Sequence, residues 1–202
     1  MMQRILWTIL LLIASVSLEA AEPVRIVSLG DSITRAVRKG VTDQETFSAL
    51  LQKQLSTAEK PVEVHNLGIG GERTDQALVR LEKDVLSLRP RIVLVMYGHN
   101  DSHIDQGTVK PRLTRDEYAG NLRQLVGKIR QANAVPLLMT PPCYSLGNKN
   151  GIGGDPDVQL EQYAQSCREV ATELKVTLID NYATWRKRRD SGEEIRNLTT
   201  DG

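Results

Sequence analysis

Short apolar runs alternate with longer amphipathic stretches along most of this 202-residue chain, and this alternation limits the folds that it can adopt. Runs rich in Val, Ile and Leu are typical of buried strands, and they cover residues 24–27, 62–64, 92–97, 135–140 and 176–179. Stretches with the helical spacing of apolar residues follow them, at 47–55, 74–88, 114–129, 155–174 and from residue 182 onward. A regular succession of strand and helix favours an α/β domain whose parallel sheet is covered on both faces.

The boundaries of the expected helices carry signals of their own. Thr74 is expected to cap the second helix, Thr114 and Glu117 form a capping box, and Asp155-Pro156 cap and open the next helix. Right-handed crossovers leave few ways to order five parallel strands. We therefore predict a three-layer α/β/α, flavodoxin-like fold with the strand order 2-1-3-4-5, in which the first strand is central.

The N-terminal residues 1–21 predict a secretory signal peptide. Arg4 precedes an apolar stretch at 5–16, and the small residues Ala20-Ala21 follow it. The apolar stretch is about a dozen residues long, short of the roughly 20 that cross a bilayer, and an uncleaved anchor is the alternative. Residues 22–202 are then expected to form one domain, secreted or periplasmic, without stable membrane association after cleavage.

Charge and cysteine content exclude several classes of function. A formal net charge of +1 gives no electrostatic reason to expect nucleic-acid binding. No cofactor and no metal site are expected, because the chain has neither a His-Glu-x-x-His motif nor a cysteine pair with ligand spacing. Two cysteines cannot form a disulfide scaffold. Cys167 has the helical spacing of a core residue and Cys143 follows a strand, so two free thiols are favoured over a single bridge.

Three short polar motifs each follow one of the first three expected strands. They are Gly30-Asp31-Ser32, Gly70-Gly71 and Gly98-His99-Asn100-Asp101. The carboxyl ends of parallel strands share one edge of the sheet, where ligands bind, so we expect the three motifs to meet there. Each motif alone is also typical of an ordinary turn or helix cap. It is their common order, each after a strand, that favours a functional site.

Together the motifs provide parts of a site for acyl transfer. Ser32 lies on a sharp turn after a strand and offers its hydroxyl as a nucleophile. The backbone N–H of Gly71 and the side-chain amide of Asn100 can donate to a developing oxyanion, and each such donor is typically worth about 2.7–4 kcal/mol of the barrier. Other classes lack support: Thr34 stands where a Gly-x-Ser-x-Gly motif needs its second glycine, and no P-loop motif is present.

In these motifs the sequence resembles the SGNH or GDSL hydrolase superfamily. Gly30-Asp31-Ser32 is similar to its first block, Gly71 to its second, and Gly98-His99-Asn100-Asp101 to its Gly-x-Asn-Asp third block. The resemblance implies a serine esterase or lipase with Ser32 as the nucleophile. It also implies an oxyanion hole formed by the backbone N–H groups of Ser32 and Gly71 and by the Asn100 side chain.

The last block of that superfamily is Asp-x-x-His, in which the histidine is the base and the aspartate orients it. Asp201 matches this aspartate, but no histidine follows it within the 202 residues. We expect His65 to be structural, His99 to line the cleft or face solvent, and His103 to lie on the surface or contact substrate. A serine without its base loses nearly all of its catalytic advantage. We therefore expect the sequence to be part of a longer protein and this chain alone to be inactive.

Two functions from different classes follow from the sequence. The favoured one is hydrolysis of carboxylic esters through an acyl-enzyme on Ser32. The alternative is a non-catalytic carbohydrate-binding or structural module that retains the fold, which the missing histidine favours. The loops at 101–112 and 144–155 are polar and glycine-rich, which favours short acyl groups, such as acetyl on a small-molecule or glycan ester, over long-chain lipids.

Overall fold

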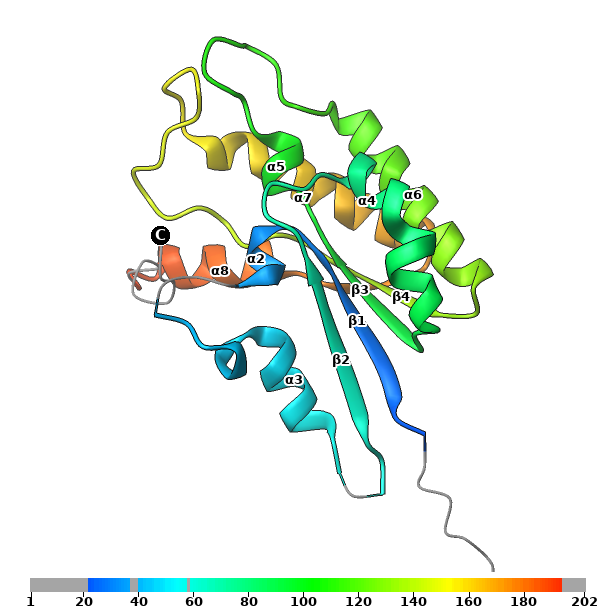
Figure 1. Ribbon diagram of the computed structural model, residues 1–202. Coiled ribbons are helices and arrows are strands. Elements are labelled where there is room, and N and C mark those ends of the chain that lie inside the picture. The colour runs from blue at the N-terminus through cyan, green and yellow to red at the C-terminus, as the bar shows by residue number, and fades with distance from the viewer. Residues whose placement is uncertain (1–21, 37–39, 58, 194–202) are drawn as a thin grey trace, which may run out of the picture.

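A computed structural model describes residues 22–36, 40–57 and 59–193. Its centre is a parallel sheet of five strands in the order β2-β1-β3-β4-β5 (Figure 1). The strands are β1 (Val24–Gly30), β2 (Val62–Gly68), β3 (Ile92–Met96), β4 (Val135–Met139) and β5 (Thr177–Ile179). The predicted flavodoxin-like α/β fold and its strand order are confirmed. The expected signal peptide, residues 1–21, and Asp201 lie outside the described residues.

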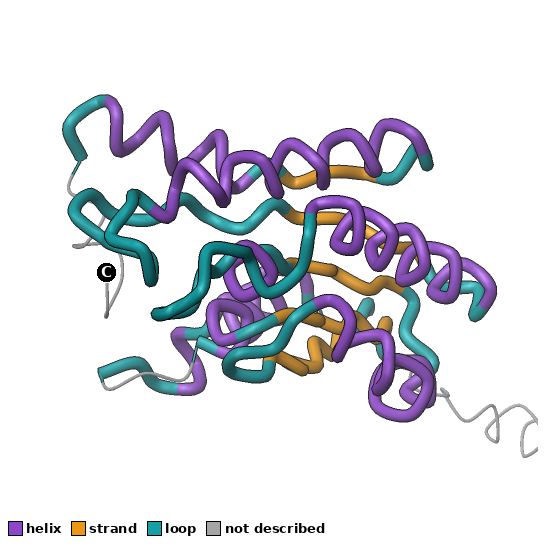
Figure 2. Tube along the Cα trace, turned by 90° about the horizontal axis from the view of Figure 1, so that it is seen from above, coloured by secondary structure: helices purple, strands orange, loops and turns teal. Residues whose placement is uncertain are grey.

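Helices cover both faces of the sheet, so that the strands form the middle layer (Figures 1 and 2). One face carries α4 (Thr74–Arg80), α6 (Arg115–Gln131) and α7 (Pro156–Glu173), and the other carries α3 (Phe47–Leu55). Successive side chains of a strand point to opposite faces. In β1, Val27 and Leu29 accordingly join the larger core under α4, α6 and α7, while Ile26 joins the smaller core under α3. After β5 the chain forms α8 (Asn181–Asp190).

The expected helix at 74–88 begins and continues differently from the prediction. Its N-cap is Arg73, whose backbone is extended (φ −115°, ψ 168°), and Thr74 is already helical. The prediction that Thr74 is the cap is wrong, because its hydroxyl donates to the carboxylate of Asp101 at 2.6 Å. After Arg80 the helix widens into a π-helical turn, Leu81–Val85, and tightens into a 3₁₀ turn, Leu86–Leu88.

The other predicted helix starts are confirmed. Thr114 accepts from the Glu117 N–H, and the Glu117 carboxylate accepts from the Thr114 N–H at 2.7 Å, which completes the capping box. The Asp155 side chain accepts from the backbone of Asp157, with Pro156 at the first helical position. These side chains satisfy backbone N–H groups that a helix start leaves without partners.

Cys143 and Cys167 are both buried and free, as the sequence favoured. Within the described ranges, no helix has the length and apolarity needed to span a bilayer. Over the same part of the chain, no group of three His, Cys, Asp or Glu side chains is arranged to hold a metal ion.

Candidate active site

The first three strands end level with one another, which brings the three polar motifs to the same edge of the sheet. Gly30 of β1 lies opposite Gly68 of β2 and Met96 of β3 in the strand register. Gly30 has to be a glycine, because a Cβ there would lie 2.0 Å from Thr34 Oγ1 and 2.6 Å from the Met96 carbonyl. The chain therefore turns tightly from β1 into the short helix α2.

Ser32 is the first residue of α2 (Ser32–Arg35) and is half-buried. Asp31, which is 2% exposed, caps this helix by accepting from the Ile33 N–H at 2.9 Å. The cap holds the turn that presents Ser32 at the carboxyl end of the central strand. The expected position of the serine, on a sharp turn between strand and helix, agrees with the structure.

Asn100 joins the three motifs through one side-chain amide. It belongs to the one-turn helix α5 (His99–Ser102) that follows β3. Its Nδ2 donates to Asp31 Oδ2 at 3.3 Å and to the carbonyl of Glu72 at 3.1 Å. Asp31 precedes Ser32, and Glu72 follows Gly71, which is exposed and has a φ of 78°. The structure thus places the residues flanking Ser32 and Gly71 in contact with Asn100.

A buried ion pair between Glu72 and Arg80 supports the second motif. The Glu72 carboxylate accepts from Arg80 Nε and Nη2, both at 2.6 Å, and from the Tyr97 hydroxyl at 2.5 Å. Burial, reinforced by the Glu72 charge, raises the pKa of Tyr97, so its hydroxyl remains protonated and donates. Arg80 also donates to the Leu67 carbonyl at 2.7 Å. The sequence analysis missed this cluster, because its three side chains come from a loop, a helix and the residue after a strand.

Asp101 of the third motif has a structural role. It is fully buried, and its Oδ1 accepts from the backbone N–H of Thr74 at 2.9 Å and from the Thr74 hydroxyl at 2.6 Å. Burial raises the pKa of this carboxyl, opposed by the bonds from Thr74. Asp101 therefore ties α5 to the start of α4 and holds its neighbour Asn100 in place.

None of the three histidines, all within the described residues, forms a hydrogen bond with the Ser32 hydroxyl. His99 Nε2 lies 2.8 Å from the Pro142 carbonyl, and its ring packs edge-on against Tyr144 at 4.4 Å between centroids. Burial lowers the pKa of His99 to about 4, so the neutral ring donates to that carbonyl. His65 lies within β2 and 3.6 Å from Glu63, and His103 lies 3.7 Å from Asp105.

Two loops bring further side chains to this edge. Arg112 Nη1 donates to Asn100 Oδ1 at 3.4 Å. Tyr144 lies against His99, and its backbone N–H donates to the buried carboxylate of Asp157 at 3.1 Å. Burial raises the pKa of Tyr144 to about 12. The sequence shows both residues only as members of polar loops, and no motif or spacing marks either of them.

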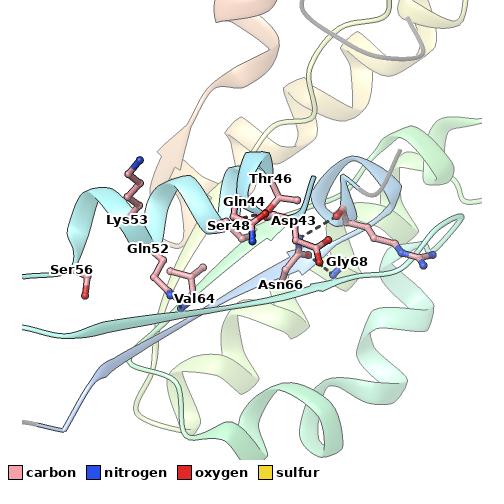
Figure 3. Close-up of a pocket in the computed structure, with 12 residues that line it drawn as sticks. Asp43, Gln44, Thr46, Ser48, Gln52, Lys53, Ser56, Val64, Asn66 and Gly68 are labelled. Carbon is pink, nitrogen blue, oxygen red and sulfur yellow. Dashed lines mark hydrogen bonds between the residues drawn. The ribbon is translucent and has the colours of Figure 1, made fainter. Parts of the chain in front are cut away.

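An open groove of about 680 Å³ runs beside this site, along β2 and α3 (Figure 3). Most of the residues that line it have polar side chains, among them Asp43, Gln52 and Asn66. None of Ser32, Gly71 and Asn100 lines it. The chemistry at the strand ends, rather than the size of this groove, therefore identifies the candidate active site.

Comparisons with known proteins agree with this geometry. Residues 28–201 match the GDSL-like Lipase/Acylhydrolase family. Acetylxylan esterase of Geobacillus stearothermophilus is 28% identical over 176 residues, which cover 81% of this chain and 78% of the relative. The uncharacterized lipoprotein YqeF of Bacillus subtilis (strain 168) is 28% identical over 199 residues, or 90% of this chain and 80% of the relative.

Solved structures show the same architecture. The acetyl xylan esterase AlAXEase superposes with a TM-score of 0.65 at 27% identity, and the match covers 84% of each chain. The family match spans most of the described sheet and all three polar motifs. The chain therefore belongs to the GDSL-like lipase/acylhydrolase family and is a carboxylic ester hydrolase.

Proposed function

We propose that this hydrolase cleaves short-chain acyl esters, acetyl esters of small molecules or glycans among them, through an acyl-enzyme on Ser32. The observation that carries the proposal is the double contact of the Asn100 amide with Asp31 and Glu72. One side chain thereby contacts the residue before the proposed nucleophile, Ser32, and the residue after the proposed donor Gly71.

In the proposed reaction the Ser32 hydroxyl attacks the ester carbonyl carbon and gives up its proton to a base. The carbonyl oxygen becomes an oxyanion, which accepts from the backbone N–H groups of Ser32 and Gly71 and from Asn100 Nδ2. The bond to the alcohol oxygen then breaks, the base returns the proton to the departing alcohol, and water hydrolyses the acyl-enzyme with the same base. The Asn100 bond to Asp31, at 3.3 Å, is longer than its bond to Glu72, at 3.1 Å. We propose that the amide hydrogen now shared with Asp31 is the one that turns to the oxyanion, since catalytic hydrogen bonds tighten only in the reacting complex.

Asp201 is proposed to orient the base, a histidine of an Asp-x-x-His block. The role of Asp201 rests on its match to that block, and the surroundings of the three described histidines support a base other than these. His99 is engaged by the Pro142 carbonyl, and His65 and His103 lie beside Glu63 and Asp105. The chain that ends at Gly202 is accordingly proposed to be inactive by itself.

The relatives support the acetyl preference and an exported location. One curated relative and one solved structure are acetylxylan esterases, and another relative, from Rattus norvegicus, is an isoamyl acetate-hydrolyzing esterase 1 homolog. We propose that residues 1–21 direct export and that the mature protein acts outside the cytoplasm, without stable membrane association. The lipoprotein relative from Bacillus subtilis supports such an extracellular or envelope location.

The test is hydrolysis of 4-nitrophenyl acetate by the protein expressed to the stop codon of its native gene. Ser32→Ala is expected to lower kcat/KM by about 10³-fold or more, because the nucleophile is lost. Ser191→Ala, which alters an exposed serine at the end of α8, is the matched control and is expected to retain activity. The chain ending at Gly202 is expected to be inert.

Activity that survives in Ser32→Ala would refute the acyl-enzyme, and an inert native-length protein would refute the acetyl-ester proposal. A second assay compares acetate release from acetylated xylooligosaccharides with hydrolysis of 4-nitrophenyl palmitate. Faster turnover of the long-chain ester would contradict the preference for short acyl groups.

A further inference from the structure

We infer that Arg112 is a positioning residue for the oxyanion hole, in which its guanidinium holds the oxygen of the Asn100 amide and so keeps the Nδ2 hydrogens turned towards the reacting edge. This inference rests on the proposed function, in which Asn100 stabilises the oxyanion. Arg112 lies outside the three polar motifs, and nothing in its own sequence surroundings marks it.

The geometry of the guanidinium supports this role. Arg112 donates from Nε to Asp105 Oδ2 at 2.9 Å and from Nη2 to Asp105 Oδ1 at 2.6 Å. This two-pronged pairing fixes the plane of the guanidinium, since both groups are flat and their spacings match. The remaining nitrogen, Nη1, then points to Asn100 Oδ1 at 3.4 Å. Asp105 also faces His103 at 3.7 Å and the positive charge of Arg73.

The loop that carries Arg112 is anchored directly behind Asn100. The Arg112 N–H donates to the His103 carbonyl and the Leu113 N–H to the Asp101 carbonyl, both at 3.0 Å. A second loop is hydrogen-bonded to this one, since the Gly151 N–H donates to the Ile104 carbonyl at 2.8 Å. The guanidinium is therefore fixed relative to α5 rather than free in solvent.

An amide needs such a partner because its two ends have nearly the same shape and can exchange by rotation. A rotated Asn100 would turn its oxygen towards the acceptors Asp31 Oδ2 and the Glu72 carbonyl, and its NH₂ group towards a cation. Arg112 disfavours that arrangement by charge and by hydrogen bonding. Its positive charge on the oxygen also polarises the amide, which makes Nδ2 a stronger donor.

The test is a double-mutant cycle with 4-nitrophenyl acetate in the native-length protein. Arg112→Gln is expected to lower kcat about tenfold, the size of one charged hydrogen bond, and to leave KM within about twofold. In the Asn100→Ala background the same change is expected to alter kcat by less than about twofold, because its target is gone. Arg112→Lys keeps the charge but not the paired geometry, and its kcat is expected to lie between those of the unmodified protein and Arg112→Gln.

The matched control is Arg123→Gln, which removes a similar paired arginine between α6 and Glu173, away from the site. It is expected to leave kcat unchanged and to have a melting temperature close to that of Arg112→Gln. Equal losses from Arg112→Gln with and without Asn100 would overturn the inference, as would a raised KM with unchanged kcat. If Ser32→Ala retains activity, the proposed function itself fails, whereas normal kcat in Arg112→Gln beside inactive Ser32→Ala refutes only the role of Arg112.

Discussion

Glu72 is the residue whose replacement should most clearly destabilise the second motif. The side chains of Glu72 and Arg80 are only 5% and 12% exposed, and three hydrogen bonds converge on the carboxylate from Arg80 and Tyr97. The charge and the hydrogen bonds of Glu72 outweigh the burial that alone would lower the pKa of Arg80. Glu72→Gln keeps the shape of the side chain but leaves the buried cation without its counter-charge.

The size of the effect follows from these contacts. An amide oxygen in the place of Oε2 can still accept from Arg80 Nη2 and from the Tyr97 hydroxyl, but the bond from Arg80 Nε is lost, because that donor then faces the amide NH₂ group. The larger cost is the missing counter-charge: breaking a buried ion pair by removing one partner costs about 3–5 kcal/mol. We predict a loss of about 3–5 kcal/mol in the free energy of unfolding, equivalent to a fall in Tm of roughly 6–20 °C for a domain of this size.

Urea unfolding followed by tryptophan fluorescence would measure this loss. The matched control is Glu173→Gln, which removes the partner of Arg123 in an exposed pair, with side chains 49% and 45% exposed. Exposed pairs contribute at most about 1 kcal/mol, so the control should change little. Tyr97→Phe removes one donor only, so its loss of free energy of unfolding should lie between those of Glu72→Gln and Glu173→Gln. If Glu72→Gln costs no more than Glu173→Gln, the buried cluster does not stabilise this edge and the reasoning is refuted.

Three further predictions concern neighbouring positions. Gly98→Ala should lower the free energy of unfolding by about 1–3 kcal/mol, because φ at Gly98 is +142° and a Cβ would lie 2.9 Å from Pro141 Cγ. An unchanged Tm in thermal unfolding would contradict this. The pKa of His99 is lowered from 6.5 to about 4, so between those pH values the unfolded state binds a proton that the folded state does not. The free energy of unfolding should therefore fall by up to about 3 kcal/mol as the pH is lowered through that window. Urea titrations at neutral and acidic pH should show this loss in the native protein and not in His99→Gln. Burial raises the pKa of both thiols, to about 12 for Cys167, so a thiol reagent should titrate Cys143 and Cys167 rapidly only after unfolding; prompt labelling of the folded protein would count against their burial.

Much of the fold could be predicted because the relevant signals are local. Strand periodicity, the capping box at Thr114 and the Asp155-Pro156 helix start each depend on a few adjacent residues, and all three agree with the structure. Right-handed crossovers left few strand orders, and the flavodoxin-like order chosen among them, which the structure confirms, placed three polar motifs at one edge. The prediction for Thr74 failed for a physical reason: its hydroxyl had a distant partner, Asp101, that no local pattern reveals.

The sequence by itself determined the class of fold and the three motifs that follow the first three strands and meet at one edge of the sheet. Only the tertiary structure decided how those motifs are held: by the buried pairing of Glu72 with Arg80 and Tyr97, and by the contact of Arg112 with Asn100. These contacts join segments far apart in the chain, and their geometry depends on the course of loops whose residues have no periodic pattern. Periodicity reports which face of an element is buried, whereas the partner of a polar side chain is set only when the elements pack.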